Sequence, residues 1–92
     1  MIIARNRSIV TCVADQGTGR RLSVTVSATR AAWPNVQDLV AISVGKQLAV
    51  QVPEALGELP PPGQPLEIEG SIEPSGEGAP AVVFVAARIE KR

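Results

Sequence analysis

Two segments of the chain alternate strictly between apolar and polar residues, and this pattern limits the fold more than any other feature. In residues 22–28 the order is Leu-Ser-Val-Thr-Val-Ser-Ala, and in residues 66–73 it is Leu-Glu-Ile-Glu-Gly-Ser-Ile-Glu. A period of two places successive side chains on opposite faces of a β-strand, whereas a helix would scatter them around its axis. Both segments are therefore predicted to be half-buried strands whose apolar sides, including Ala28 and Ile72, share one core.

The remaining apolar runs are also typical of strands. Residues 9–14 are rich in β-branched side chains and join residues 21–29 through a Gly-containing loop, which predicts a hairpin. Residues 39–44 and 47–52 are predicted strand segments with a turn or bulge between them. The run 81–89 is apolar on both sides, which predicts a central or doubly covered strand.

Between the third and fourth strands, residues 53–59 are predicted to form one or two helical turns. Pro53 at the first helical position and an early Glu54 suit a helix start, and the Pro-Pro-Pro-Gly sequence at 60–63 ends it. The order strand, strand, strand, short helix, strand, strand predicts one all-β domain over residues 1–92, a small five-stranded OB-type Greek-key barrel. An open β-sandwich fragment or a swapped dimer built from the same strands is the alternative.

Histidine is absent from the sequence, and its absence removes several kinds of chemistry. Ser–His and Cys–His nucleophiles and histidine-containing zinc sites cannot be built. The loop at 16–19 lacks the lysine and the helix of a phosphate-binding loop, and the glutamates of 67–73 occupy outward strand positions typical of solvated side chains. The one cysteine, Cys12, is predicted to be a buried, reduced thiol. We therefore expect no enzyme, no metal site and no cofactor.

Targeting signals are also not expected from this sequence. No stretch reaches the length of a membrane span, and the N-terminus has no apolar region long enough for a signal peptide. These features predict a cytoplasmic protein with no membrane partner.

Positive and negative charges are divided between the two halves of the chain. Residues 1–46 hold six Lys and Arg against two Asp, and residues 47–92 hold three Lys and Arg against seven Glu, so the net charge is zero. Such asymmetry predicts one of two arrangements. The folded protein has one basic face, or oppositely charged strands lie side by side and neutralise each other.

The second half of the sequence resembles the bacterial single-stranded DNA-binding proteins. The resemblance covers roughly residues 40–90: a Gly-Lys-Gln-Leu at 45–48, a short helical stretch, a Pro-Gly step at 62–63, the alternating strand at 66–72 and a closing strand at 85–89. The closing strand is also similar to that of the related primosomal replication protein. The resemblance implies an OB fold that binds single strands. The chain departs from the family in its short loop at 74–80, which carries Glu77 and no basic residue, and in lacking most stacking aromatics.

Candidate ligand contacts follow from the OB interpretation, since OB folds bind oligonucleotides on the second and third strands. The predicted nucleic-acid-binding residues are Arg20, Arg21, Arg30, Trp33 and Lys46. For the four cations, ordinary surface charge is the alternative. For Trp33 the alternatives are a stacking platform and a half-buried plug at the barrel end, and the adjacent Pro34 favours the plug. The hydroxyl row at 23–29 is either a plain wet face or a surface that reaches phosphates and sugars.

The expected function is a non-catalytic single-stranded nucleic-acid-binding module, accessory to DNA replication, recombination or a mobile element. Its expected partners are single-stranded DNA or RNA and a second copy, because Val83, Val85 and Ile89 are predicted to exceed what one small core can cover. One alternative is an OB-like protein-interaction or assembly domain. Another comes from the Ala-Arg-Asn-Arg at 4–7 and the Pro-Gly-Gln-Pro-Leu at 62–66, which are similar to small oxyanion-binding barrels of molybdate-handling proteins.

Overall fold

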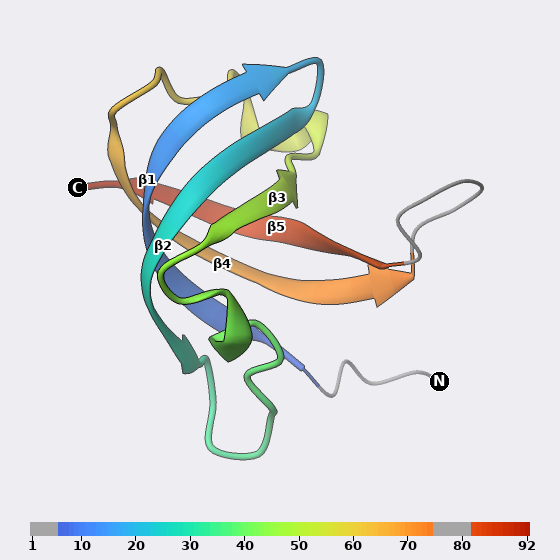
Figure 1. Cartoon of the computed structure of the whole chain (residues 1–92). Coiled ribbons are helices and arrows are strands. Elements are labelled where there is room, and N and C mark those ends of the chain that lie inside the picture. The colour runs from blue at the N-terminus through green and yellow to red at the C-terminus, as the bar shows by residue number, and fades with distance from the viewer. Residues whose placement is uncertain (1–5, 75–81) are drawn as a thin grey trace.

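Five strands form one sheet that closes on itself, in a computed structural model that describes residues 6–74 and 82–92. The strands are β1 (Ser8–Thr18), β2 (Arg21–Ala31), β3 (Gln47–Gln51), β4 (Pro65–Pro74) and β5 (Val82–Lys91). Their order around the barrel is β1-β2-β3-β5-β4, with β4 returning to pair with β1 (Figure 1). Every pair is antiparallel except β3 and β5, which run parallel over two residues of each strand. The predicted small all-β barrel is confirmed.

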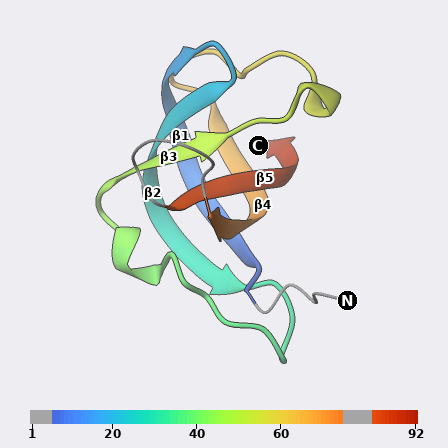
Figure 2. The same cartoon turned by 90° about the vertical axis from the view of Figure 1, so that its right-hand side faces the viewer.

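The core is built from the apolar sides of the two alternating segments. Leu22, Val24, Leu66 and Ile68 are fully buried in one cluster, and Phe84 of β5 packs among them. The view along the barrel shows the sheet wrapped around this space, with β1, β2 and β4 curving across each other (Figure 2). Burial of large aliphatic side chains is the main favourable term in folding a chain of this size. The prediction of one common core is confirmed for these residues.

A bulge in β2 overturns the prediction for Ala28. The register between β1 and β2 shifts at Thr11 and Cys12, which face Ala28 and Val26, so that Ser27 has no partner on β1. An extra residue in a strand inverts the phase of everything beyond it. Ala28 is therefore exposed, and Thr29, predicted to face outward, turns inward and is half-buried.

Residues 39–44 are not a strand, contrary to the prediction. They form two turns around a short 3₁₀ helix, η1 (Ala41–Ser43), and only Val40 enters the core. The cause lies in Asp38, whose carboxylate oxygen Oδ1 accepts a hydrogen bond from the Val40 amide at 3.2 Å. An aspartate that bonds the backbone two residues on turns the chain away from an extended path.

The connection between β3 and β4 holds less helix than predicted. Of residues 53–59, only a single 3₁₀ turn forms, η2 (Glu54–Leu56), and it stops at Gly57, where φ is 85°. A left-handed φ ends helical geometry and suits glycine.

The apolar side chains of Val83, Val85 and Ile89 on β5 are wholly or partly buried within the chain itself. Val83 is only 8% exposed and Val85 and Ile89 are half-buried. The idea that these three residues form an uncovered surplus is therefore wrong for Val83. A homodimer stays a prediction, but the exposure of Val83 no longer supports it.

Candidate nucleic-acid interface

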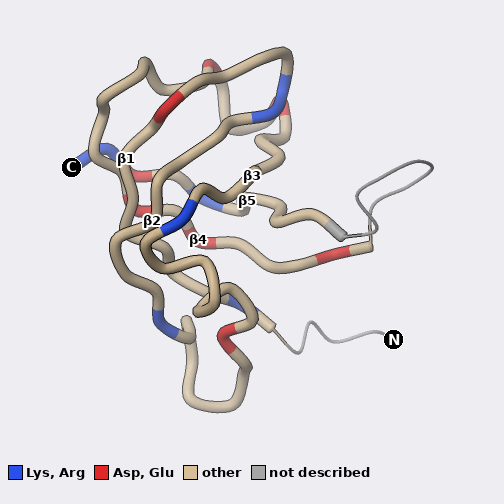
Figure 3. Tube along the Cα trace, in the orientation of Figure 1, with Lys and Arg blue, Asp and Glu red and all other residues tan. Residues whose placement is uncertain are grey.

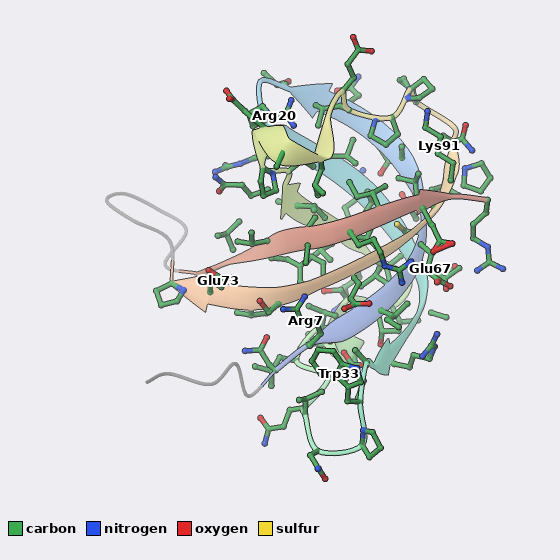
Figure 4. The ribbon with its side chains drawn as sticks, turned by 180° about the vertical axis from the view of Figure 1, so that it is seen from behind. Arg7, Arg20, Trp33, Glu67, Glu73 and Lys91 are labelled. Atoms are coloured by element: carbon green, nitrogen blue, oxygen red, sulfur yellow. The ribbon has the colours of Figure 1, made fainter. Side chains whose placement is uncertain are left out.

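The outer face of β4 and β5 carries ion pairs that neutralise most of its charge. Glu69 lies between two arginines: its Oε2 is 3.6 Å from Arg7 Nη1, and its Oε1 is 3.3 Å from Arg88 Nη2. Two further pairs join Arg92 to Glu67 and Arg88 to Glu90. Hydrogen bonds to Glu90 and then to Glu69 raise the pKa of Arg88. Figure 4 shows this face, with Arg7 and Glu67 labelled. Oppositely charged strands thus lie side by side here, one of the two predicted arrangements.

The cations of β2 and of the turn before β3 have a different environment. Arg21, Arg30 and Lys46 are exposed, and among the described residues no carboxylate lies within salt-bridge distance of any of them. In Figure 3 blue segments mark both ends of β2 and the chain just before β3. Arg21 and Arg30 are nine residues apart on one strand, which places them roughly 30 Å apart at about 3.3 Å per residue. The unpaired positive charge therefore extends along β2 instead of gathering at one point.

Arg20 has a different role from its neighbour Arg21. Its Nε donates to the Val52 carbonyl at 2.9 Å, and its Nη2 donates to the carbonyls of Pro53 and Gly57 at 2.9 and 2.6 Å. The guanidinium thereby ties the loop that contains η2 to the tip of the β1–β2 hairpin. Most of its hydrogen-bonding capacity is used inside the protein, so the structure separates Arg20 from the other predicted contacts.

Most side chains on the outer face of β1, β2 and β3 around these cations are neutral, and many of them are polar. Arg21, Ser23 and Thr25 of β2 each lie opposite an outward residue of β1 and one of β3. The three rows across the strands are Thr18, Arg21 and Gln51; Gln16, Ser23 and Ala49; and Val13, Thr25 and Gln47.

Two shallow hollows lie at the hairpin end of this face, on either side of Arg21. The larger has a volume of about 430 Å³ and is lined by Gln16, Thr18, Arg21, Ser23 and Ala49. The smaller, about 170 Å³, is lined by Thr18, Arg20, Arg21 and Gln51. The nearby carboxylate of Asp15 accepts hydrogen bonds from Thr25 and Gln47, at 2.8 and 3.4 Å. Around the hollows the face thus offers hydroxyls, amides and one arginine, which can bond phosphates and sugars, together with the carboxylate of Asp15, whose oxygen Oδ2 is bonded to Thr25 and Gln47.

Trp33 lies away from this face, at the end of the barrel near Arg7. Its ring is 53% exposed and is not part of the core, and the buried residue in the segment at this end is Val40. The Arg7 guanidinium stands 5.5 Å from the ring centroid, a cation–π contact, while the same arginine pairs with Glu69 (Figure 4). Trp33 therefore belongs with the ion-paired side of the barrel, and the structure does not bring it together with Arg21 or Lys46.

Two polar residues hold this end of the barrel together: Asp38, which the sequence analysis did not single out, and Asn6 of the Ala-Arg-Asn-Arg motif. Asp38 accepts hydrogen bonds from the hydroxyls of Ser8 and Thr29, at 2.8 and 2.7 Å. Asn6 pairs with the backbone of Ile72, donating to its carbonyl and accepting from its amide. The Asn6 side-chain amide is thus bonded within the protein, and the oxyanion-binding alternative stays a prediction. Residues 4 and 5 of the same motif lie outside the described residues.

Cys12 is buried in the core, as predicted. Burial raises the pKa of its thiol to about 11, with a smaller contribution from the negative charge of Asp15. The thiolate is the reactive form, so a thiol with this pKa is inert at neutral pH. Within residues 6–74 and 82–92 no group of three or more potential metal ligands occurs.

Comparison with known proteins adds no relative: no family model, no curated protein and no solved structure matches this chain. In the described part of the chain, no helix is long and apolar enough to cross a membrane. The function is therefore argued from the geometry of the barrel.

Proposed function

We propose that this protein is an OB-type module that binds single-stranded nucleic acid along the outer face of β1, β2 and β3. The strand order, with a parallel β3–β5 pair closing an otherwise antiparallel barrel, supports the OB assignment. OB barrels bind oligonucleotides on the face of their second and third strands. A place in DNA replication, recombination or a mobile element is the biological setting we propose.

The observation that carries the proposal is the uneven pairing of charge around the barrel. On the β4–β5 side Arg7, Arg88 and Arg92 are held by carboxylates, with the exposed Lys91 as the exception. Of Arg21, Arg30 and Lys46, none is paired among the described residues. A polyanion gains most from cations that need not first break an ion pair. Arg21 and Arg30 lie at the two ends of β2 and Lys46 lies beside its middle, an extended arrangement that suits the backbone of a single strand.

Binding by this face is expected to be weak and strongly dependent on salt. Each phosphate contact on a single strand contributes about 0.7 to the slope of log affinity against log salt, so three contacts predict a slope of about −2. The face has no aromatic residue to stack on bases among its described residues. Stacking otherwise adds roughly 1–3 kcal/mol per base, so its absence lowers the affinity.

The proposal is tested by titrating a fluorescein-labelled oligothymidine of about 15 nucleotides, near the upper site size of an OB fold, at low and moderate salt. The variant Arg21→Glu/Arg30→Glu should abolish binding. The control Arg88→Glu/Lys91→Glu changes the net charge by the same amount on the other side of the barrel and should retain most of the affinity. Equal loss in both variants would contradict the assigned face.

A second candidate function is an OB-like domain that binds a protein and no nucleic acid. It is favoured by the exposed aliphatic residues of the 39–44 segment, described below. Absence of oligothymidine binding by the wild-type protein at low salt would select this candidate.

A further inference from the structure

The segment between β2 and β3 presents three aliphatic side chains to solvent. Ile42 is 77% exposed, Leu39 47% and Val44 45%. Together these three residues form what we call the aliphatic ledge. Three such exposed side chains within six residues of one short segment form a candidate contact surface.

The ledge is a rigid part of the fold. Inside it, the Ser43 amide donates to the Val40 carbonyl at 2.9 Å and the Val44 amide to the Ala41 carbonyl at 3.2 Å. Val40 anchors it in the core at 2% exposure. A surface that is already ordered loses little conformational entropy when it binds.

The ledge is joined directly to the middle of β2. The Gly45 amide donates to the Val26 carbonyl at 2.8 Å, and the Val26 amide donates to the Lys46 carbonyl at 2.9 Å. In Figures 1 and 2, η1 projects beside β2 on the side where the chain turns into β3. Lys46 therefore stands between the ledge and the outer face of β1–β3.

Three arguments select the occupant of the ledge. A stable protein interface uses roughly 20–30 residues on each side, far more than this turn provides. Two copies meeting here would also bring their Lys46 side chains toward each other. A single strand, in contrast, combines phosphates that need a cation with unstacked bases that need apolar contact, and isoleucine and leucine are used elsewhere as wedges against bases.

We propose that the aliphatic ledge packs against bases of the bound single strand while Lys46 contacts its phosphates. The inference rests on the proposed function. The ledge would supply the base contacts that the outer face of β1–β3, without aromatic residues in the described chain, does not.

The experiment compares two probes of equal length and phosphate count: oligothymidine of about 15 nucleotides and an abasic oligomer with the same backbone. Wild-type protein should bind oligothymidine about tenfold more tightly, the size of effect that one or two base contacts provide. Leu39→Ser/Ile42→Ser should remove this difference and leave the affinity for the abasic probe unchanged. Lys46→Glu should weaken both probes equally.

Ala87→Ser is the matched control, since Ala87 is an exposed aliphatic residue on β5, outside the proposed face, and the variant should leave the base preference intact. Circular dichroism melting checks that the serine variants fold. Equal affinity of the wild type for both probes, or a preference that survives Leu39→Ser/Ile42→Ser, would overturn the inference while the proposed function stands. If the wild type binds neither probe, the proposed function fails and the inference with it. Sedimentation showing a wild-type dimer that the ledge variant converts to a monomer would assign the ledge to a second copy.

Discussion

The adjacent arginines at the hairpin tip should respond to mutation in opposite ways. Arg20 donates three hydrogen bonds to backbone carbonyls 32–37 residues away, whereas Arg21 is exposed and donates none among the described residues. In Arg20→Ala water must replace the arginine as the donor to the three carbonyls, and the loop after β3 loses this link to the hairpin. Replacing Arg21 by alanine removes only a surface charge.

The size of the Arg20 effect follows from its contacts. A hydrogen bond to a charged group contributes about 1.5–3 kcal/mol when buried, and Arg20 is half-exposed, so about 1 kcal/mol for each bond is appropriate. Arg20→Ala should therefore lower the free energy of unfolding by about 2–3 kcal/mol, or the Tm by about 10–20 °C for a domain of this length. Arg21→Ala should stay within about 0.5 kcal/mol of the wild type.

Urea and thermal denaturation measure both variants, and oligothymidine titration well below both transitions measures binding. Arg20→Lys is the decisive control because it keeps the charge but cannot reach three carbonyls at once. It should recover less than half of the lost stability. If Arg20→Lys were as stable as the wild type, or if Arg21→Ala were as unstable as Arg20→Ala, the assignment of Arg20 as the link to the loop would be refuted.

Substitutions at four further positions test the packing of the barrel and the hydrogen bonds at its end. Gly70→Ala should destabilise by about 3 kcal/mol or more, because the new methyl group overlaps the backbone carbonyl of Val85, whereas Gly17→Ala meets only a movable leucine side chain and should cost less than about 1 kcal/mol; urea denaturation compares them. The raised pKa of Cys12, about 11 against 9.0, favours the protonated thiol in the folded state, so wild-type stability should fall as pH rises from 9 through 11, by more than in Cys12→Ala; a parallel decline in both would contradict the pKa. Asp38→Ala should lower Tm more than Asp38→Asn, which keeps one acceptor oxygen, and equal Tm values would show that its hydrogen bonds do not hold this end.

The core could be predicted from the sequence because its pattern is local. Alternation at 22–26 and 66–68 has only one geometry that buries every apolar side chain on one side, and the strands adopt it. The pattern does not contain the bulge at Ser27. Serine is compatible with a regular or a bulged position, and the choice depends on how β1 aligns with β2. The orientation of Ala28 therefore could not be read from its own neighbours.

The conformation of residues 39–44 also could not be predicted from a local sequence pattern. Five apolar residues in six suggest a strand, but the chain turns because Asp38 bonds the Val40 amide while Ser8 and Thr29 hold its carboxylate in place. Those partners are 30 and 9 positions away in the sequence. A feature that depends on such distant contacts appears only once the strands are assembled.

For the candidate interface, the sequence likewise gives the type of each residue but not its environment in the fold. Sequence reasoning selected Arg20, Arg21, Arg30 and Lys46 by charge, and nothing local distinguishes the first from the others. The structure separates them because Arg20 lies in the turn, within reach of the loop after β3, while Arg21 starts the strand and faces outward. Trp33 was selected as the only tryptophan, but it lies beyond the end of β2, where its ring contacts Arg7, and not on the outer face of β1–β3.

The chain has no net charge, but the strand order separates a side of the barrel where charges are paired from a side where cations are unpaired. β4 lies between β1 and β5, so Glu67 and Glu69 meet Arg7 just before β1, Arg88 on β5 and Arg92 just after it, and these charges cancel. β2 lies between β1 and β3, and most of the outward residues that flank it across the sheet are uncharged: glutamine, threonine, valine, isoleucine and alanine. One carboxylate, that of Asp15 on β1, lies among them and bonds Thr25 and Gln47, but no carboxylate of the described residues is within salt-bridge distance of Arg21 or Arg30. Long-range attraction of a polyanion depends on such a local excess of positive charge and not on the sum over the chain. A protein with no net charge can in this way present one face that attracts phosphates.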